Sequence, residues 1–458
     1  MHFHTWTFLP FFLIAYAVYV LVKAPSFRVL WIVIVSYVFY AWGSPLYLAL
    51  IVYSTLVDYT ALARMEKSPR KKMWLSLSIA NGLFLLGFFK YGLFITENIN
   101  HLLSQLGSGY TLALPGLLLP LGLSFYVFKS MGYVIDCYRG DAPRETNLIR
   151  HAAFVSFFPI LLAGPIERAA NLLPQFRGPL RVTRQDMADG LSLFTVGLFK
   201  KLALADALAL YVGKVYNAPE RFQAPALILA TLAFAWQIYF DFSGYTDMAR
   251  GIARAMGFRI MLNFNHPYLA TGLGDFWRRW HISLSTWFRD YVYIPLGGSR
   301  KGKLITYRNV MLTMVVSGLW HGAAWTFVIW GALHGIGLLL TRALESRQAY
   351  RDKCPKLVKQ LWVFVFVTFA WIFFRAATWD QACLIVSRIV RSGLSDPEFP
   401  LLFAALIAVV WAYQFLCESS LKQYLALGWV RVSTMVVMLI YLVLFSGSGG
   451  QAFIYNQF

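Results

Sequence analysis

The sequence is poor in charged residues, and negative charge is the scarcer kind. Charged residues make up 14% of the 458 residues, and 21 Asp and Glu stand against 41 Lys and Arg. A soluble globular domain carries about 25% charged residues, so water is not the main solvent of this chain. The hydrophobic content is 59% and the mean hydropathy is +0.57. These values predict an integral membrane protein.

Cysteine is also scarce. Four cysteines stand far apart, with no CxxC pair and no histidine at ligand spacing, at positions Cys137, Cys354, Cys383 and Cys417. This pattern predicts neither a zinc site nor a disulfide framework, and we expect no metal. A nucleophile elbow and a phosphate-binding loop are also missing, so neither competes for an active site.

The formal net charge of +20 would suggest nucleic acid as a partner of a soluble protein. Here the basic residues lie mainly in short loops between apolar runs, as at 64–72 and 300–303. Short basic loops next to membrane helices stay in the cytosol and contact anionic lipid. We therefore expect the charge to orient the protein in a membrane, and we expect no nucleic-acid binding.

Apolar runs long enough to cross a membrane recur from one end of the chain to the other. They leave no room for a large soluble domain, so we expect a single membrane domain over residues 1–458. The predicted spans are 5–22, 28–43, 45–62, 73–94, 112–136, 190–213, 224–248, 309–340, 360–376, 399–417 and 430–447. This gives an all-α polytopic protein with roughly ten to twelve crossings, and a cytosolic 64–72 loop places both termini outside the cytosol.

Three regions depart from simple spans. Prolines make a continuous helix improbable over 154–181. The stretch 274–298 is too polar to face lipid and too aromatic for a solvated loop, so we expect it to be re-entrant or interfacial. The run 310–340 is long for one straight span and rich in glycine, which predicts close helix packing or a break.

His321 is the sharpest candidate for chemistry. It lies in Ser-Gly-Leu-Trp-His-Gly-Ala-Ala-Trp, residues 317–325, inside a predicted span. An ionisable side chain there needs a role or a good partner, and imidazole transfers protons near neutral pH. The alternative is a histidine that only hydrogen-bonds a carbonyl between helices. For His334, which faces away from His321 on an uninterrupted helix, the sequence favours this structural role.

A second histidine, His281, lies in the arginine- and tryptophan-rich stretch 276–298. Guanidinium groups bind anions and indole rings stack, so this stretch could hold a phosphorylated nucleotide donor. The alternative is an interfacial belt of aromatic residues with arginines that reach to the lipid headgroups.

The blocks 276–298 and 319–335 closely resemble the membrane-bound O-acyltransferase family in its bacterial cell-envelope branch. The blocks 157–166 and 239–249 are similar to those of alginate O-acetylation membrane subunits, so the resemblance covers most of the chain. It implies a helical bundle around a tunnel through the membrane, with additional re-entrant or interfacial helices. It also implies His321 as the catalytic histidine and His281 as its support.

The resemblance implies further features of the site. The acyl donor comes from the cytosolic side, acetyl-CoA being the expected donor substrate, and no cofactor is bound. A separate extracytoplasmic acetyltransferase of the serine (SGNH-like) type then modifies the polymer, alongside the polysaccharide synthesis and export machinery. The candidates for donor binding or tunnel lining are Trp277, Arg278, Arg279, Trp280, Ser285, Trp320 and Asp241.

The tail 446–458 ends in an aromatic hexapeptide after a flexible Ser/Gly segment. It resembles the C-terminal motif of the companion peptide of teichoic-acid D-alanylation systems, whose tyrosine is proposed to carry the acyl group. That likeness makes Tyr455 a candidate acyl carrier on the extracytoplasmic side. The alternative is that Tyr455 anchors the tail at the membrane interface.

The sequence therefore predicts an acyltransferase in a bacterial cytoplasmic membrane that moves acetyl for O-acetylation of an exported polysaccharide. Alginate, cellulose and peptidoglycan would leave such a subunit looking much alike. Two alternatives stay open. The same fold could transfer D-alanyl or a longer acyl group, or a bundle with buried charges could transport a polar solute without covalent chemistry.

Overall fold

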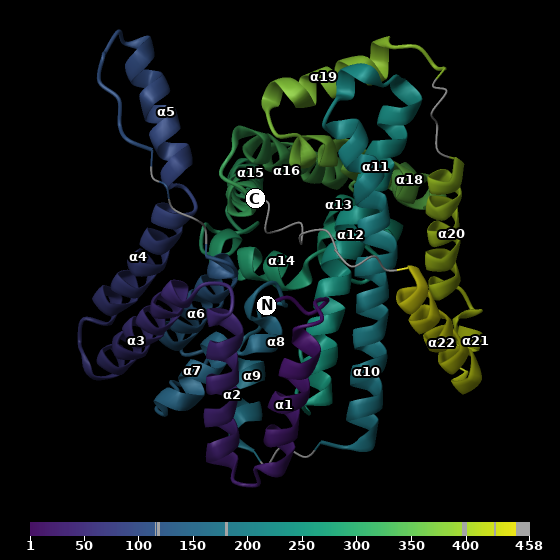
Figure 1. Ribbon diagram of the computed structural model, residues 1–458. Coiled ribbons are helices and arrows are strands. Elements are labelled where there is room, and N and C mark those ends of the chain that lie inside the picture. Colours follow the sequence, from purple (N-terminus) through teal and green to yellow (C-terminus); the bar gives the residue numbers. More distant parts are fainter. Residues whose placement is uncertain (115, 117–119, 179–181, 396–400, 426, 446–458) are drawn as a thin grey trace. The chain divides into compact units, whose positions relative to one another are not determined.

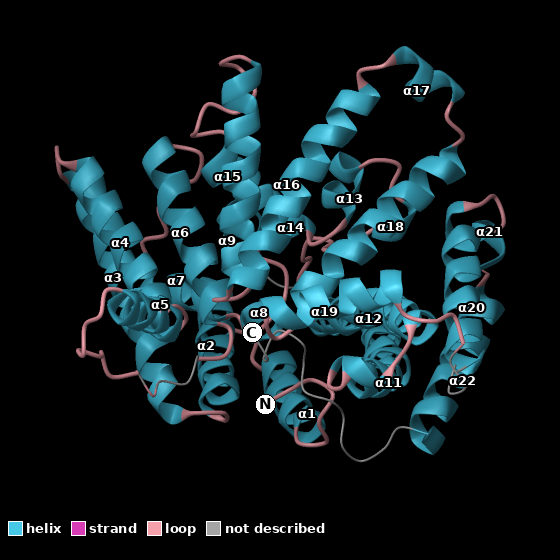
Figure 2. Ribbon diagram, turned by 90° about the horizontal axis from the view of Figure 1, so that it is seen from above, coloured by secondary structure: helices cyan, strands magenta, loops and turns pink. Residues whose placement is uncertain are grey.

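The computed structural model describes residues 1–458 except 115, 117–119, 179–181, 396–400, 426 and 446–458. Over these residues every regular element is a helix, as Figures 1 and 2 show, and no strand is present. The expectation of an all-α protein is confirmed.

The chain forms two compact units. The first comprises Met1–Leu191 and Ala249–Met261. Its helices are α1 (Phe8–Leu21), α2 (Pro25–Ala41), α3 (Pro45–Lys67), α4 (Lys71–Phe89), α5 (Gly92–Gln105), α6 (Leu123–Arg139), α7 (Leu148–Ser156), α8 (Phe158–Leu161) and α9 (Ala169–Arg177). Helix α10 (Arg184–Phe199) begins in this unit and ends in the second.

The second unit comprises Ser192–Met248 and Leu262–Phe458. Its elements are the π-helix Lys200–Ala205, α11 (Asp206–Tyr216), most of α12 (Ala224–Ala255), α13 (Leu273–Arg279), α14 (Ile282–Phe288), the π-helix Arg289–Tyr293, α15 (Lys303–His321), α16 (Trp325–Glu345), α17 (Gln348–Lys353), α18 (Lys356–Arg375), α19 (Trp379–Arg391), α20 (Leu401–Glu418), α21 (Lys422–Leu425) and α22 (Gly428–Phe445). Short 3₁₀ turns lie at Pro219–Arg221 and Pro267–Leu269. The single membrane domain expected from the sequence stays a prediction.

Five helices among the described residues are long and apolar enough to cross a membrane: α3, α4, α12, α16 and α18. Shorter apolar helices occur at Phe8–Leu21, Pro25–Ala41, Ile407–Leu416 and Gly428–Leu444. The helices follow the predicted spans closely at both ends of the chain, and differ most at 112–136, where the helix begins only at Leu123. The total number of crossings stays a prediction.

The two proline- and polar-rich regions contain no long helix. Between Phe154 and Arg177 the chain forms the end of α7, the four-residue α8 and the nine-residue α9. Between Leu273 and Tyr293 it forms two seven-residue helices and a π-helix of five residues. At about 1.5 Å per residue none of these crosses a hydrocarbon core, as expected from the sequence.

The predicted span 309–340 is a hairpin of two helices. Helix α15 ends at His321 because Gly322 adopts an extended backbone with φ −158° and ψ 151°. The two helices then pack closely, since a β-carbon on Gly318 would overlap the carbonyl oxygen of Phe327 and one on Gly331 would overlap that of Met314. Both the close packing and the break expected from the glycines are present.

Buried ion pairs connect α12 to the preceding π-helix. The ammonium of Lys201 lies 2.9 Å from Asp241 and 2.8 Å from Asp206, and the side chain of Lys201 is 1% exposed. Next to it, Lys200 lies 2.7 Å from Asp247. Charges in such an apolar surrounding persist because they are paired, which explains why these ionisable groups tolerate a membrane segment.

Replacement of Lys201 by methionine is expected to destabilise the protein by about 3 kcal/mol, because it removes a cation shared by two buried carboxylates. The thermal midpoint of the purified protein in detergent measures the effect. Adding Asp241→Asn to this variant should recover part of the loss, since one of the two carboxylates is then neutral. Lys353→Met, on an exposed position of α17, is the matched control. An unchanged midpoint for Lys201→Met would contradict this account of the ion pairs.

Candidate active site

His281 lies fully buried between α13 and α14, outside the five helices long enough to span a membrane. Its ring contacts Phe242 at a centroid distance of 4.7 Å, Trp320 at 5.9 Å and His321 at 6.5 Å. Burial lowers the pKa of His281 to about 3, so the imidazole is neutral at pH 7. A neutral ring offers one donor and one acceptor nitrogen.

His321, the last residue of α15, is 2% exposed and enclosed by rings. The centroids of Trp320 and Trp330 lie 5.0 Å from its own, and that of Phe374 on α18 lies at 5.4 Å. All three contacts are edge-to-face. The structure therefore brings His281 and His321 together in an aromatic surrounding.

His334 belongs to the same cluster. On an uninterrupted helix it would face away from His321, but the break after His321 turns α16 back along α15. The ring of Trp330 therefore contacts both histidines, at 5.0 Å and 4.7 Å. His334 is fully buried, and among the described residues its ring nitrogens have no hydrogen-bond partner. Its structural role stays a prediction.

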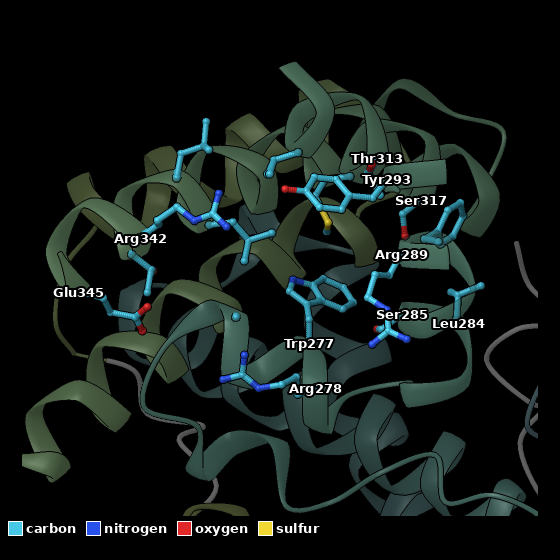
Figure 3. Close-up of a pocket in the computed structure, with 17 residues that line it drawn as sticks. Trp277, Arg278, Leu284, Ser285, Arg289, Tyr293, Thr313, Ser317, Arg342 and Glu345 are labelled. Atoms are coloured by element: carbon cyan, nitrogen blue, oxygen red, sulfur yellow. The ribbon is translucent and has the colours of Figure 1, made fainter. Parts of the chain in front are cut away.

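A cavity of about 390 Å³ opens beside this cluster in the second unit (Figure 3). Figure 3 shows Arg342 and Glu345 on one side of it, Ser317 and Leu284 on the other, and Trp277 between them. The lining residues are Gly274, Trp277, Arg278, Leu284, Ser285, Phe288, Arg289, Tyr293, Val310, Thr313, Met314, Ser317, Leu338, Leu339, Thr341, Arg342 and Glu345. Most of the wall is apolar, and three arginines against one glutamate give it a positive charge.

The cavity runs toward His321 along α15. Its lining residues on that helix, Val310, Thr313, Met314 and Ser317, share one helix face, and His321 follows on this face one turn after Ser317. We call these five residues the α15 row. On α16 the lining positions Leu338, Thr341, Arg342 and Glu345 lead in the same way to His334.

Trp277 connects the cavity to the histidines. It lines the cavity, and its ring contacts Trp330 at 5.8 Å and His334 at 5.0 Å. Trp330 in turn contacts His321. His321 itself does not line the cavity and lies one helical turn beyond its last lining residue on α15, Ser317.

The residues proposed from the sequence for donor binding fall into three sets. Trp277, Arg278 and Ser285 line the cavity. Trp320 contacts both histidines, and the other three lie away from the lining. Arg279 pairs with Asp275, Trp280 is buried among Phe264, Phe276 and Trp371, and Asp241 pairs with Lys201. Tyr455 lies outside the described residues.

The polar lining residues that were missing from the sequence-based set are Arg289, Tyr293, Thr313, Ser317, Thr341, Arg342 and Glu345. Ser317 is 4% exposed. Its spacing of four residues from His321 was a usable signal, because side chains so spaced lie on one helix face. Arg342 gave no such signal, since only the fold brings the end of α16 to the same cavity as Arg289, the first residue of the π-helix Arg289–Tyr293.

No group of three or more His, Cys, Asp or Glu lies together as a candidate metal site over the ranges that the structure describes. The absence of a metal and of a bound cofactor stays a prediction. The chemistry available in the described site is that of imidazole, hydroxyl and guanidinium groups. This set suits proton transfer and anion binding beside an apolar wall.

The chain is similar in sequence to known acyltransferases. The model of the membrane-bound O-acyltransferase family matches residues 139–378. A probable alginate O-acetylase of Azotobacter vinelandii is 41% identical over 430 residues, which cover 92% of this chain and 84% of that protein. A peptidoglycan O-acetyltransferase of Helicobacter pylori is 38% identical over 84% of this chain and 77% of its own length. A more distant teichoic acid D-alanyltransferase of Streptococcus thermophilus is 30% identical over 52% of this chain and 60% of its own.

Proposed function

The chain belongs to the membrane-bound O-acyltransferase family, and on this basis we propose that it moves an acetyl group from a cytosolic thioester donor for O-acetylation of an exported polysaccharide. The observation that carries the proposal is the α15 row, which leads from a positively charged cavity to a buried histidine. The relatives named as alginate and peptidoglycan O-acetyltransferases support acetyl as the group. The chain is a multi-pass membrane protein, and we place it in the bacterial cytoplasmic membrane with both termini outside the cytosol.

The cavity suits a nucleotide thioester such as acetyl-CoA. Guanidinium groups bind phosphates in bidentate fashion, and Arg278, Arg289 and Arg342 would hold the phosphorylated part of the donor. The apolar wall along α15 and α16 suits the pantetheine arm. The thioester would then lie at the Ser317 end, where the hydroxyl can donate a hydrogen bond to the carbonyl oxygen as negative charge develops on it.

The transfer step needs a base, which His321 would supply. A hydroxyl oxygen attacks the thioester carbonyl, and its proton passes to the imidazole of His321. The new C–O bond forms as the C–S bond breaks, and the thiolate leaves with the proton that His321 accepted. The neighbouring ring of His281 would hold that of His321 in place.

The acceptor hydroxyl in this proposal is that of Tyr455. A phenol with an ordinary pKa of about 10 needs a base at neutral pH, and a phenyl ester stays reactive enough to pass acetyl onward. A serine-type extracytoplasmic acetyltransferase would accept it and modify the polymer, beside the polysaccharide export machinery. The similarity to a D-alanyltransferase supports D-alanyl as the second candidate for the transferred group.

Tyr455 can be tested by covalent labelling. Purified protein incubated with acetyl-CoA labelled in the acetyl group should gain one acetyl group, found on the C-terminal peptide by mass spectrometry. Tyr455→Phe should remove this adduct, because phenylalanine lacks the attacking oxygen. Tyr424→Phe, which removes a half-exposed phenol from another part of the chain, is the matched control and should leave the adduct in place.

Three results would change the proposal. Turnover of acetyl-CoA with Tyr455 unlabelled would remove the carrier and indicate direct transfer to the partner. A label from a D-alanyl thioester, with none from acetyl-CoA, would favour the second candidate. Absence of turnover with both donors, in the presence of the partner, would contradict acyl transfer and favour a transporter.

A further inference from the structure

His281 has a backbone conformation that a residue with a side chain rarely adopts. Its φ is +44° and its ψ is +53°, and among the described residues only His266 shares a positive φ without being glycine. In the left-handed region the β-carbon of such a residue lies too close to the following carbonyl oxygen, so the conformation is strained. A residue remains there only where its surroundings hold it, and such positions gather at functional sites.

Four hydrogen bonds hold the backbone on both sides of His281. The carbonyl of Asn263 accepts from the amide of Ile282 at 2.9 Å, and the amide of Asn265 donates to the carbonyl of Arg279 at 2.9 Å. The side-chain oxygen of Asn263 accepts from the amide of Ser283 at 3.1 Å and from its hydroxyl at 2.9 Å. Asn263 is thus the acceptor in three of these four bonds.

These four hydrogen bonds, which we call the Asn263 clamp, are shielded from water, and Phe264 packs on His281. Asn263 is fully buried and Ser283 is 1% exposed, so water does not compete for their hydrogen bonds. Phe264 lies between the two asparagines, and its ring contacts Trp280 at 5.0 Å and His281 at 6.4 Å. The segment 263–265 therefore fixes both the backbone and one side of the ring of His281.

We propose that Asn263 is a positioning residue, which holds His281 in its left-handed conformation so that the imidazole stays against His321. The proposal rests on the proposed function, in which His321 is the base and His281 supports it. Asn263 itself contacts neither donor nor acceptor. Loss of its side chain leaves the amide and hydroxyl of Ser283 buried without their acceptor and frees His281 to leave the strained conformation.

Asn309 offers a matched comparison within the same unit. It is also fully buried, and its amide donates to the carbonyls of Leu296 and Gly298 at 3.1 Å and 3.0 Å. No hydrogen bond connects Asn309 to the segment around His281. The side-chain oxygen of Asn309 accepts from the guanidinium of Arg308 at 3.0 Å and 3.3 Å. Alanine at this position therefore removes a buried asparagine with four side-chain hydrogen bonds, and leaves those of Asn263 intact.

The first test is kinetic. Asn263→Ala should lower kcat for acetyl transfer by about 10- to 100-fold, as expected for a displaced supporting group, while KM for acetyl-CoA changes less than about twofold. Ser283→Ala keeps the hydrogen bond from the backbone amide of residue 283 to Asn263, so it should lower kcat less than Asn263→Ala does. Asn309→Ala should leave kcat near that of the wild type.

The second test asks whether Asn263 acts through His281. His281→Gly removes the imidazole and accepts the left-handed conformation without strain. If the proposal holds, the double variant Asn263→Ala/His281→Gly is no slower than His281→Gly alone. If the two losses multiply, or if Asn263→Ala costs no more than Asn309→Ala, the proposal is wrong although acyl transfer itself stands.

A third readout does not depend on turnover. Diethyl pyrocarbonate labels accessible imidazole rings, and His334, equally buried, serves as the internal reference. Asn263→Ala should raise the labelling rate of His281 by about threefold or more relative to His334, because local opening exposes the ring. An unchanged ratio of the two labelling rates would contradict the proposal that Asn263 holds His281. If no acyl donor is turned over by the wild type, the proposed function fails, and this ratio still decides whether Asn263 holds His281.

Discussion

Alanine in place of His321 is expected to lower the rate of acetyl transfer by about 10³-fold, within the range that a positioned general base contributes. The loss should appear in kcat, with little change in KM for acetyl-CoA, because the cavity proposed to bind the donor ends one helical turn before His321. Steady-state release of CoA, with the partner enzyme and an acceptor present, measures both constants.

His101→Ala provides the control for this experiment. His101 is an exposed histidine on α5 whose ring is 3.1 Å from the side chain of Gln105, and its loss should not affect turnover. If His321→Ala retained more than about a tenth of the wild-type kcat, proton transfer by this imidazole could not be the main source of rate. His321 would then be a structural histidine between helices, the alternative left open by its sequence context.

Gly318→Ala is expected to destabilise the protein by about 3 kcal/mol, the upper range for an overpacked interior. The added β-carbon would overlap the backbone oxygen of Phe327, which cannot move away as a flexible side chain could. Helices α15 and α16 would have to separate at the turn that carries His321. We therefore expect the thermal midpoint and the acyl-transfer rate to fall together.

Gly213→Ala is the matched control for this packing. Gly213 lies within α11, and a β-carbon there would meet no atom within 4 Å. Alanine is the better helix former by about 1 kcal/mol, so this variant should be as stable as the wild type or slightly more so. An unchanged midpoint for Gly318→Ala would show that the hairpin is packed less closely than the structure indicates.

Much of the fold could be predicted from the sequence because apolar length is a strong signal. The runs that contain α3, α4, α12 and α18 were located from hydropathy and loop charge. The exact break in the run 309–340 could not be located this way. It depends on Gly322, where a β-carbon would overlap the ring of Phe327. Hydropathy carries no information about such contacts.

The candidate site was only partly predictable for a related reason. Trp277, Arg278 and Ser285 lie in one polar and aromatic stretch, which made them conspicuous in an apolar chain. Arg342 looks like an ordinary basic residue at the end of a membrane helix, and only the hairpin places it at the same cavity. The role of Asn263 was equally hidden, because its partner Ser283 is distant in sequence and the need for it arises from the backbone of His281.

The central claim, delivery of acetyl across the bilayer, is tested most directly in vesicles. Purified protein would be reconstituted with its 64–72 loop facing outward, with a partner acetyltransferase and polysaccharide trapped inside. Acetyl-CoA labelled in the acetyl group would be added outside. We expect labelled acetyl esters on the enclosed polysaccharide, and none with His321→Ala. Label that stays outside as free acetate, or that reaches the polysaccharide equally in the His321→Ala vesicles, would contradict the claim.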